Sequence, residues 1–139
     1  MGSIDRQPFK ELQTAIHTLL TGGGSPIGIQ MYDEVESEPT FPYGTYGEVI
    51  DSPFEARGVN GRAVIFPLHF FSRDSGGKFE IYDIMDEVIA KMNAGKLSMT
   101  NFSEIWKTHT TPKVERLEKE PGDSFKGTLN WLIVVAKKT

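Results

Sequence analysis

The sequence predicts an α+β fold, in which two α-helices pack on one face of a mainly antiparallel β-sheet. Two segments carry apolar residues at the three- and four-residue spacing of an amphipathic helix. The other apolar segments are short, rich in Val, Ile and Phe, and bounded by Gly, Pro or Asp. Because these segments follow one another with few helices between them, most neighbouring strands should pair antiparallel.

The two helices are predicted at residues 8–20 and 78–93. Pro8 suits the first turn of the first helix, and the glycines that begin at Gly22 end it. Gly95 closes the second helix. Each helix has one apolar face to bury, formed by Phe9, Leu12, Ile16, Leu19 and Leu20 in the first and by Ile81, Ile84, Met85, Val88, Ile89 and Met92 in the second.

Three strands are predicted before the second helix, at residues 29–32, 43–50 and 63–73. The segment Asp51–Arg62 is rich in Gly, Pro and Asn and is interpreted as a long loop or a flexible hairpin tip. The third strand contains Pro67, which has no N–H to donate. We therefore expect this strand at an edge of the sheet or bulged at the proline.

Three further extended segments are predicted after the second helix, and the first of them, Leu97–Phe102, is short. Residues 104–118 alternate loosely between apolar and polar, and residues 125–136 form the last strand. The turn signal Lys119–Asp123 should join them into an antiparallel hairpin. The chain shows no internal repeat and no linker long enough to divide it, so a single domain over residues 1–139 is expected.

Large aromatic residues are expected on both faces of this sheet. Phe66 and Phe70 share one side of their strand, and Phe71 points to the other. Helices on one side cover one face only, so the other face would meet another subunit. A bulge at Pro67 that reorients these side chains is the alternative. The aromatic candidates for an exposed surface are Tyr43, Tyr46, Phe54, Phe66, Phe70, Phe71, Trp106 and Trp131.

Charge is distributed unevenly along the 139 residues, whose net charge is −4. Residues 1–56 hold nine acids and two bases, whereas residues 57–139 hold ten acids and thirteen bases. No Lys or Arg occurs between Glu11 and Ala56. The acidic total argues against a protein that coats DNA, which needs a basic excess. No apolar stretch has the length of a membrane span, so no membrane partner is expected.

The residues of catalysis and cofactor binding do not form recognisable patterns. There is no cysteine, which excludes thiolate chemistry and disulfides. The three histidines, His17, His69 and His109, fall on separate predicted elements without a metal-ligand spacing. The glycines after Thr21 end a helix, whereas a phosphate loop begins one. We therefore predict a protein that is not an enzyme and has no cofactor and no catalytic or metal site.

A cluster of acidic residues stands apart from this background. It lies in a polar loop and consists of Asp33, Glu34, Glu36 and Glu38. Carboxylates at this density suit a divalent cation or a partner-docking surface. A solvated loop is the simpler interpretation, and the sequence does not decide among the three.

Taken together, the order of elements resembles the tail-completion, or tail-terminator, proteins of long-tailed (siphovirus-like) bacteriophages and prophages. The resemblance spans nearly the whole chain. It rests on a leading helix and then on Met31-Tyr32-Asp33, Phe41-Pro42-Tyr43, Phe71-Ser72-Arg73, a helix with Glu80, Ile84, Met85 and Val88, and a last strand rich in Phe, Trp, Leu, Ile and Val.

The resemblance implies a structural protein of the virion. Proteins of this family form a ring, typically a hexamer, on the head-proximal end of the tail tube. The ring ends tail assembly, binds the tail tube protein and the head-completion (connector) protein, and lets genome DNA pass through its lumen. The alternatives are another neck or tail component, such as a head-closure or tube-like subunit, and a small α+β ligand-binding domain.

Candidate interface residues follow from charge and loop composition. A cyclic ring joins two different patches of neighbouring subunits, and the acidic and basic halves of this chain would supply them. We assign the acidic cluster Asp33, Glu34, Glu36 and Glu38 to one such patch, or to the lining of the lumen. The segment Asp51–Arg62 is assigned to an arm that reaches the tube or a neighbour, with Phe54, Arg57 and Arg62 as its contact residues.

Overall fold

The computed structural model describes residues 8–22, 27–33, 39–56, 59–73, 77–117 and 124–138. It has the predicted α+β fold, with two helices and a seven-stranded sheet in which all pairs but one are antiparallel. The elements are α1 (Phe9–Thr21), β1 (Gln30–Tyr32), β2 (Tyr43–Tyr46), β3 (Ile50–Ala56), β4 (Val59–Arg73), α2 (Gly77–Ala94), β5 (Phe102–His109), β6 (Lys113–Leu117) and β7 (Ser124–Lys137).

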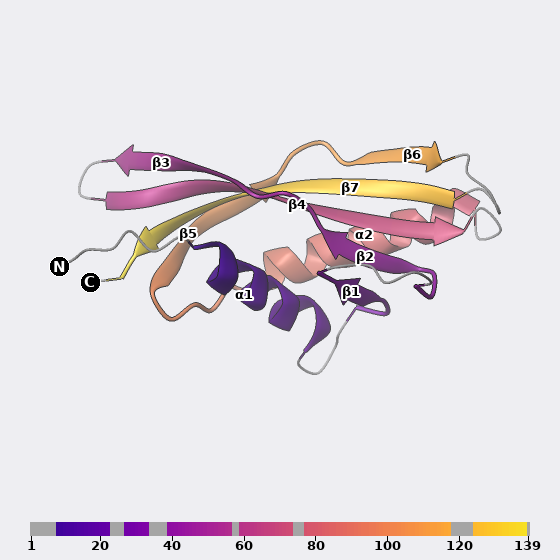
Figure 1. Ribbon diagram of the computed structural model, residues 1–139, viewed down its shortest axis with the longest axis horizontal. Coiled ribbons are helices and arrows are strands. Elements are labelled where there is room, and N and C mark those ends of the chain that lie inside the picture. The colour runs from indigo at the N-terminus through magenta and orange to yellow at the C-terminus, as the bar shows by residue number, and fades with distance from the viewer. Residues whose placement is uncertain are drawn as a thin grey trace.

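Two long strands, β4 and β7, form the middle of the sheet (Figure 1). They pair antiparallel without interruption from Gly61↔Ala136 to Arg73↔Ser124. Along its other side, β4 pairs with β2 and β3 in succession, and β7 pairs in the same way with β5 and β6. Each central strand is therefore flanked by two shorter strands that follow one another along its outer side. The short β1 pairs in parallel with β2.

Pro67 lies in a central strand, so the expectation of an edge position or a bulge in its own strand was wrong. The β4–β7 register passes through Pro67↔Asn130 unchanged. The carbonyl of Pro67 accepts a hydrogen bond from the Gly47 N–H at 2.9 Å, so its backbone polar groups face the β2–β3 side. The interruption between β2 and β3 lies there, and the neighbouring strand accommodates the proline by breaking its own ladder.

The hydrophobic core lies between the sheet and the two helices, which Figure 1 shows on the same side of it. Every second residue of β4 and β7 points to the helices, and burial alternates accordingly except at Ile133–Val135, where three successive residues are buried. Phe66, Phe70 and Trp131 are completely buried there. The core is completed by Leu12, Ala15, Ile16 and Leu20 of α1 and by Ile81, Met85, Val88 and Met92 of α2.

Most predicted boundaries agree with the structure within a few residues, and three differ. The strand predicted at 43–50 stops at Tyr46 and resumes as β3. The segment Asp51–Arg62 follows the second of its two predicted alternatives, a hairpin, but its two sides pair as the strands β3 and β4. The strand predicted at 104–118 is divided into β5 and β6, which both pair with β7, and Pro112 lies between them.

Charged side chains fix the irregular segment between α2 and β5. The Lys107 Nζ donates to the Gly95 carbonyl at 2.7 Å and to the Glu104 carboxylate at 2.8 Å, and both side chains are 6% exposed. The Leu97 N–H donates to the same carboxylate, and the Glu11 carboxylate accepts two hydrogen bonds from Asn101. These bonds satisfy backbone groups that no ladder pairs.

Gly127 allows α2 to approach the sheet closely. A Cβ at this position would lie 2.5 Å from the Met85 Sδ and 3.2 Å from the Ile81 side chain. We expect Gly127→Val to lower the free energy of unfolding by about 1–3 kcal/mol through overpacking. Urea denaturation measures this, with Gly28→Val as the control, because a Cβ at Gly28 meets nothing within 4 Å. Equal effects of the two substitutions would contradict this packing.

Candidate assembly surface

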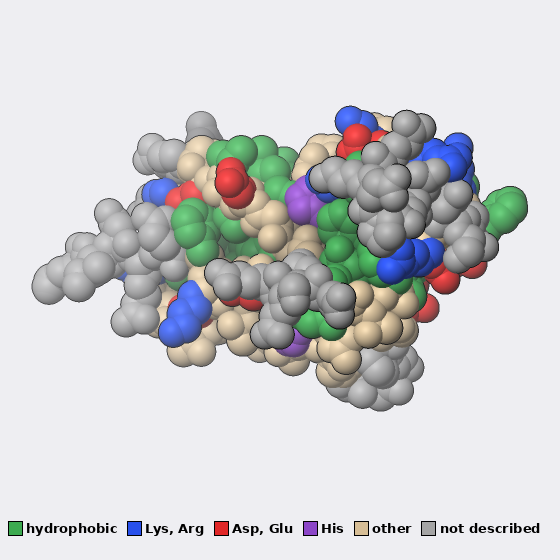
Figure 2. Space-filling view, turned by 45° about the vertical axis from the view of Figure 1, so that its right-hand side comes forward, with side chains coloured by type: hydrophobic (Ala, Val, Ile, Leu, Met, Phe, Trp, Pro, Cys, Tyr) green, Lys and Arg blue, Asp and Glu red, His purple; other side chains and the backbone are tan. Residues whose placement is uncertain are grey.

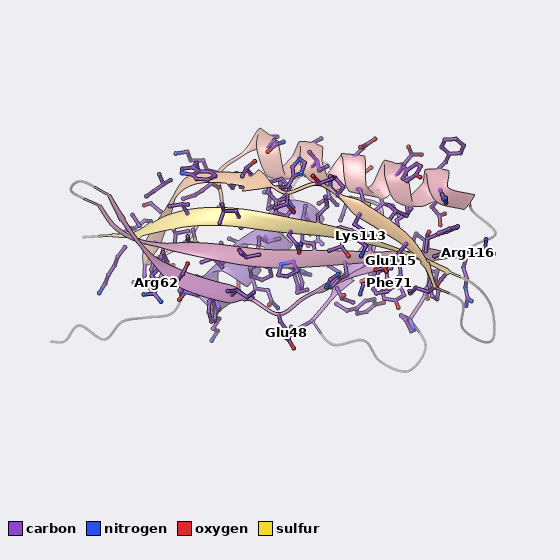
Figure 3. The ribbon with its side chains drawn as sticks, turned by 90° about the horizontal axis from the view of Figure 1, so that it is seen from above. Glu48, Arg62, Phe71, Lys113, Glu115 and Arg116 are labelled. Carbon is purple, nitrogen blue, oxygen red and sulfur yellow. The ribbon has the colours of Figure 1, made fainter. Side chains whose placement is uncertain are left out.

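The sheet face away from α1 and α2, here called the outer face, is not covered by any described element (Figure 3). No bulge interrupts β4, so the sequence-based alternation holds: Phe66 and Phe70 point to the core and Phe71 to the outer face. Of the aromatic residues expected at a surface, Trp106 is exposed, whereas Phe66, Phe70 and Trp131 are core residues. Both faces carry apolar side chains, as predicted.

An apolar stripe crosses one part of the outer face. Ile50 of β3 pairs with Ile65 of β4, which pairs in turn with Leu132 of β7. Ile50 is 61% exposed and Ile65 is 38% exposed. In the next strand, a bulge after Glu104 leaves Ile105 and Trp106 exposed in succession, at 39% and 43%. Exposed apolar groups that adjoin across neighbouring strands are typical of an interaction surface.

An aromatic cluster occupies the opposite end of the outer face. Tyr43 of β2 stacks on Phe71 of β4 with ring centroids 4.9 Å apart, and Phe41 meets Tyr43 edge to face at 5.0 Å. The Arg73 guanidinium lies 4.2 Å from the centre of the Phe41 ring. Burial raises the pKa of Tyr43, and Arg73 partly offsets this. These contacts join β2, the chain before it, and the end of β4.

Charge separates the two lateral edges of the sheet. β1, β2 and β3 come from the part of the chain without Lys or Arg, and exposed Glu48 lies at the break between β2 and β3. On the opposite side, β6 carries Lys113 and Arg116, and β7 contributes Lys126 beside them. Figure 3 shows Glu48 on one edge, Lys113 and Glu115 near Phe71, and Arg116 toward the right-hand end of the sheet. In Figure 2, Lys and Arg side chains are more frequent toward the right-hand end.

The predicted interface residues fall in different places. Asp33 follows β1, is exposed, and accepts a 3.0 Å hydrogen bond from Gln13. Arg62 forms an ion pair with Asp51 across the β3–β4 hairpin, and its Nε lies 3.0 Å from both carboxylate oxygens. Phe54 pairs with Gly61 in that hairpin. Glu34, Glu36, Glu38 and Arg57 lie outside the described residues.

The structure adds interface candidates that sequence reasoning missed. Glu48 and Lys113 lie on opposite lateral edges, and Ile105 becomes exposed through the bulge. The change in charge near residue 57 signalled the two edges. No sequence pattern marked the bulge, because its position depends on the pairing of β5 with β7.

A groove of about 520 Å³ lies between α1 and the β1–β2 edge. It is relevant to the alternative interpretation of the chain as a small α+β ligand-binding domain. Its lining includes His17, Tyr46 and Asp33. The Tyr46 hydroxyl lies 2.8 Å from the His17 Nδ1, and burial, reinforced by Asp33, raises the pKa of Tyr46, which keeps the phenol protonated.

Across the described ranges, no three His, Asp or Glu residues are grouped to hold a metal ion. No helix among them is long and apolar enough to cross a membrane.

Comparison with known proteins identifies a matching family and a solved structure with a similar fold. The chain matches the family described as "Tail completion protein gp17" over residues 11–136. A solved structure titled "Virion of native gene transfer agent (GTA) particle" contains a chain with a TM-score of 0.64 and 14% sequence identity. That likeness covers 92% of this chain and 90% of the other. No curated protein matches significantly.

His69 should make stability depend on pH. It lies on the outer face, 3.2 Å from the Thr128 hydroxyl, and burial lowers its pKa, with Lys126 adding to the effect and Glu115 opposing it. The folded protein therefore binds fewer protons near the ordinary value of 6.5 than the unfolded chain does. The free energy of unfolding should fall as the pH drops through about 6.5.

Urea denaturation of the His69→Gln variant tests this effect. The loss of stability between about pH 7.5 and about pH 5.5 should be smaller in the variant than in the parent protein. Identical pH dependence in the two proteins would show that His69 is not responsible.

Proposed function

The chain belongs to the tail completion protein gp17 family, and from that premise we propose that it caps the head-proximal end of a phage tail tube as a ring. Family membership makes it a structural protein of the tail. In this proposal the ring, typically of six copies, ends tail assembly and offers a joining surface to the head. Its partners are the tail tube protein and the head-completion protein, and genome DNA passes through the lumen.

One observation carries the proposal: a single subunit has two unlike lateral edges and an open sheet face. In a closed cyclic ring each interface joins two different patches, so the two lateral edges of one subunit must differ. The edge formed by β1 and β3 is free of Lys and Arg, whereas β6 on the opposite side carries Lys113 and Arg116 with one acid, Glu115, between them. Opposite charges favour this head-to-tail order over contacts between like edges.

The fold supports a structural role in a second way. The central strands and both helices use their apolar residues to form one core, and the edges and outer face remain available for contacts. The likeness to a chain in a gene transfer agent virion shows that such a fold occurs in a phage-like particle. A position in the virion, on the tail, is consistent with this.

Another neck or tail component of the same particle is the second candidate. Unlike edges serve any cyclic ring equally well, so the fold does not separate a tube cap from a head-closure ring. The difference lies in the partner that the ring binds, which makes binding to polymerised tail tubes the decisive property.

Electron microscopy of negatively stained tail tubes tests the proposal. Tubes incubated with the protein should carry a density at one end only and should stop elongating when more tube protein is added. The same tubes without the protein should have two bare ends. A protein that never binds tube ends, or that decorates the length of the tube, would contradict the proposed function.

Charge reversal tests the two edges. We expect Lys113→Glu and Glu48→Lys each to weaken ring formation at least tenfold, because like charges then oppose one another across the interface. An equimolar mixture of the two variants should restore closed rings of alternating subunits, because every contact then joins opposite charges, and the double variant should also regain much of the assembly. Sedimentation and tube-end counts measure this.

Asp86→Lys serves as the matched control for these substitutions. Asp86 is exposed on α2, away from both edges, so its reversal should leave assembly unchanged. If all three single variants assemble like the parent protein, the charged edges do not form the subunit interface.

A further inference from the structure

The exposed side of α2 carries two aromatic residues, Phe79 and Tyr82, here called the α2 pair. Phe79 is 79% exposed, more than any other large hydrophobic residue that the structure describes, and Tyr82 is 41% exposed. Their rings meet edge to face with centroids 6.2 Å apart. The pair belongs to the helix layer, which Figure 1 shows on one side of the sheet, and is therefore separate from the outer face.

Packing of the core does not account for the α2 pair. α2 buries one side against the sheet, beginning with Ile81 and Met85. The α2 pair, Asp83 and Asp86 follow one another at three- and four-residue steps, so they share a stripe on the other side of the helix. In α1, by contrast, the exposed positions are all polar: Lys10, Thr14, His17 and Thr18. An aromatic pair in contact with solvent on a helix is typical of a binding surface.

Acidic side chains lie beside the α2 pair. Residues 78–87 contain four acids and one base, Lys78. Asp83 and Asp86 are exposed, and the Glu87 carboxylate accepts a 3.0 Å hydrogen bond from the Gly28 N–H. Such a surface repels DNA phosphates, anionic lipid headgroups and other copies of itself. It favours a protein with basic side chains, which can pair with the carboxylates and also stack on the aromatic rings.

We propose that the α2 pair is the docking site for the head-side protein that joins the capped tail, and that this protein presents an apolar pocket bordered by Lys or Arg. The inference rests on the proposed function, in which the ring offers a joining surface to the head. It goes further in naming the residues of that surface and the chemistry of the partner that binds them.

The order of assembly favours the head-side protein over the tube and over neighbouring copies. Neighbours and the tube bind when the cap forms, and the uncharged stripe of Ile50 and Ile65 suits a contact that stays buried from then on. The joining surface instead remains in water on a finished tail until a head arrives. Aromatic anchors among acidic residues suit it, because the aromatic rings supply binding energy and the like charges keep two caps from joining each other.

Head joining by capped tail tubes tests the α2 pair. Tubes are capped with the parent protein or with the variant that combines Phe79→Ala and Tyr82→Ala, and are mixed with DNA-filled heads purified from cells that make no tails. We expect the variant to keep the urea midpoint of the parent protein and its capping of tube ends, because neither ring belongs to the core. The fraction of heads joined to tails, counted in negative stain, should fall about tenfold or more.

Asp83→Lys tests the charge of the docking site, and Asn93→Lys is its matched control. Asn93 is exposed at the other end of α2, about 20 Å from Phe79 along the helix axis. We expect Asp83→Lys to lower head joining several-fold, because the new ammonium group repels a basic partner, and Asn93→Lys to leave it unchanged. Equal joining by the two variants would overturn the recognition of a basic partner at this site.

Photo-cross-linking identifies the occupant of the site, because the chain has no cysteine of its own. Lys78→Cys, labelled with a benzophenone maleimide, leaves the α2 pair and the acids intact. In joined particles it should form a covalent product with a head protein, whereas labelled Asn93→Cys should not. A product with the tube protein or with another copy of this chain, an equal product from the control, or no product would overturn the assignment.

Head joining and tube capping fail independently in these experiments. If the double variant joins heads as well as the parent protein does, or if caps of the parent protein join no heads, the docking site is overturned and the tube cap stands. A double variant that no longer caps tubes would also overturn it, since the α2 pair would then belong to the ring or to the tube contact. A parent protein that never caps tubes would overturn the proposed function instead.

Discussion

The unbroken pairing of β4 with β7 is the constraint on which the rest of the structure depends. It aligns two long strands whose alternate residues form the floor of the core, and both helices pack against that floor. The pairing also decides where irregularities are tolerated. Pro67 remains in the central strand because the break falls in its neighbour, between β2 and β3, and the second break falls between β5 and β6. Interruption is confined to the flanking strands, so the core stays continuous.

This arrangement determines which surfaces remain for assembly. Two helices suffice to cover one face of the sheet, and the outer face keeps Ile50, Ile65 and Trp106 exposed. The interrupted flanking strands form two lateral edges, and each irregularity brings a feature to the surface: Glu48 at one break, Ile105 and Trp106 at a bulge. The same local departures from regular pairing that accommodate the sequence therefore also supply the candidate contacts of a ring subunit.

Sequence reasoning predicted the fold class, both helices and the long central strands, because these depend on local periodicity. The 3.6-residue apolar spacing of α1 and α2 and the alternation about Phe66, Phe70 and Phe71 are visible within single segments. Sequence reasoning failed where the pairing between strands determines the local structure. Gly, Pro and Asn at positions 53–61 suggested a long loop or a hairpin tip, and the pairing with β4 shows a hairpin in which β3 is a regular strand. The exposure of Ile105 follows from the register between β5 and β7, which no local pattern encodes.

The uneven charge along the sequence corresponds to a spatial division in the sheet. It marks the two lateral edges, because the chain builds one side of the sheet before residue 57 and the other side after β4. Of the acidic cluster, Asp33 lies among the described residues, and the pairing of β3 with β4 is a register that the sequence alone did not reveal.

The most direct test of this account is a cryo-electron microscopy reconstruction of a capped tube end, at a resolution that traces the chain. The account predicts a closed ring in which the outer face and the two lateral edges are buried between copies or against the tube, with the exposed side of α2 free. A ring held together through α1 and α2, with the outer face open to solvent, would contradict it.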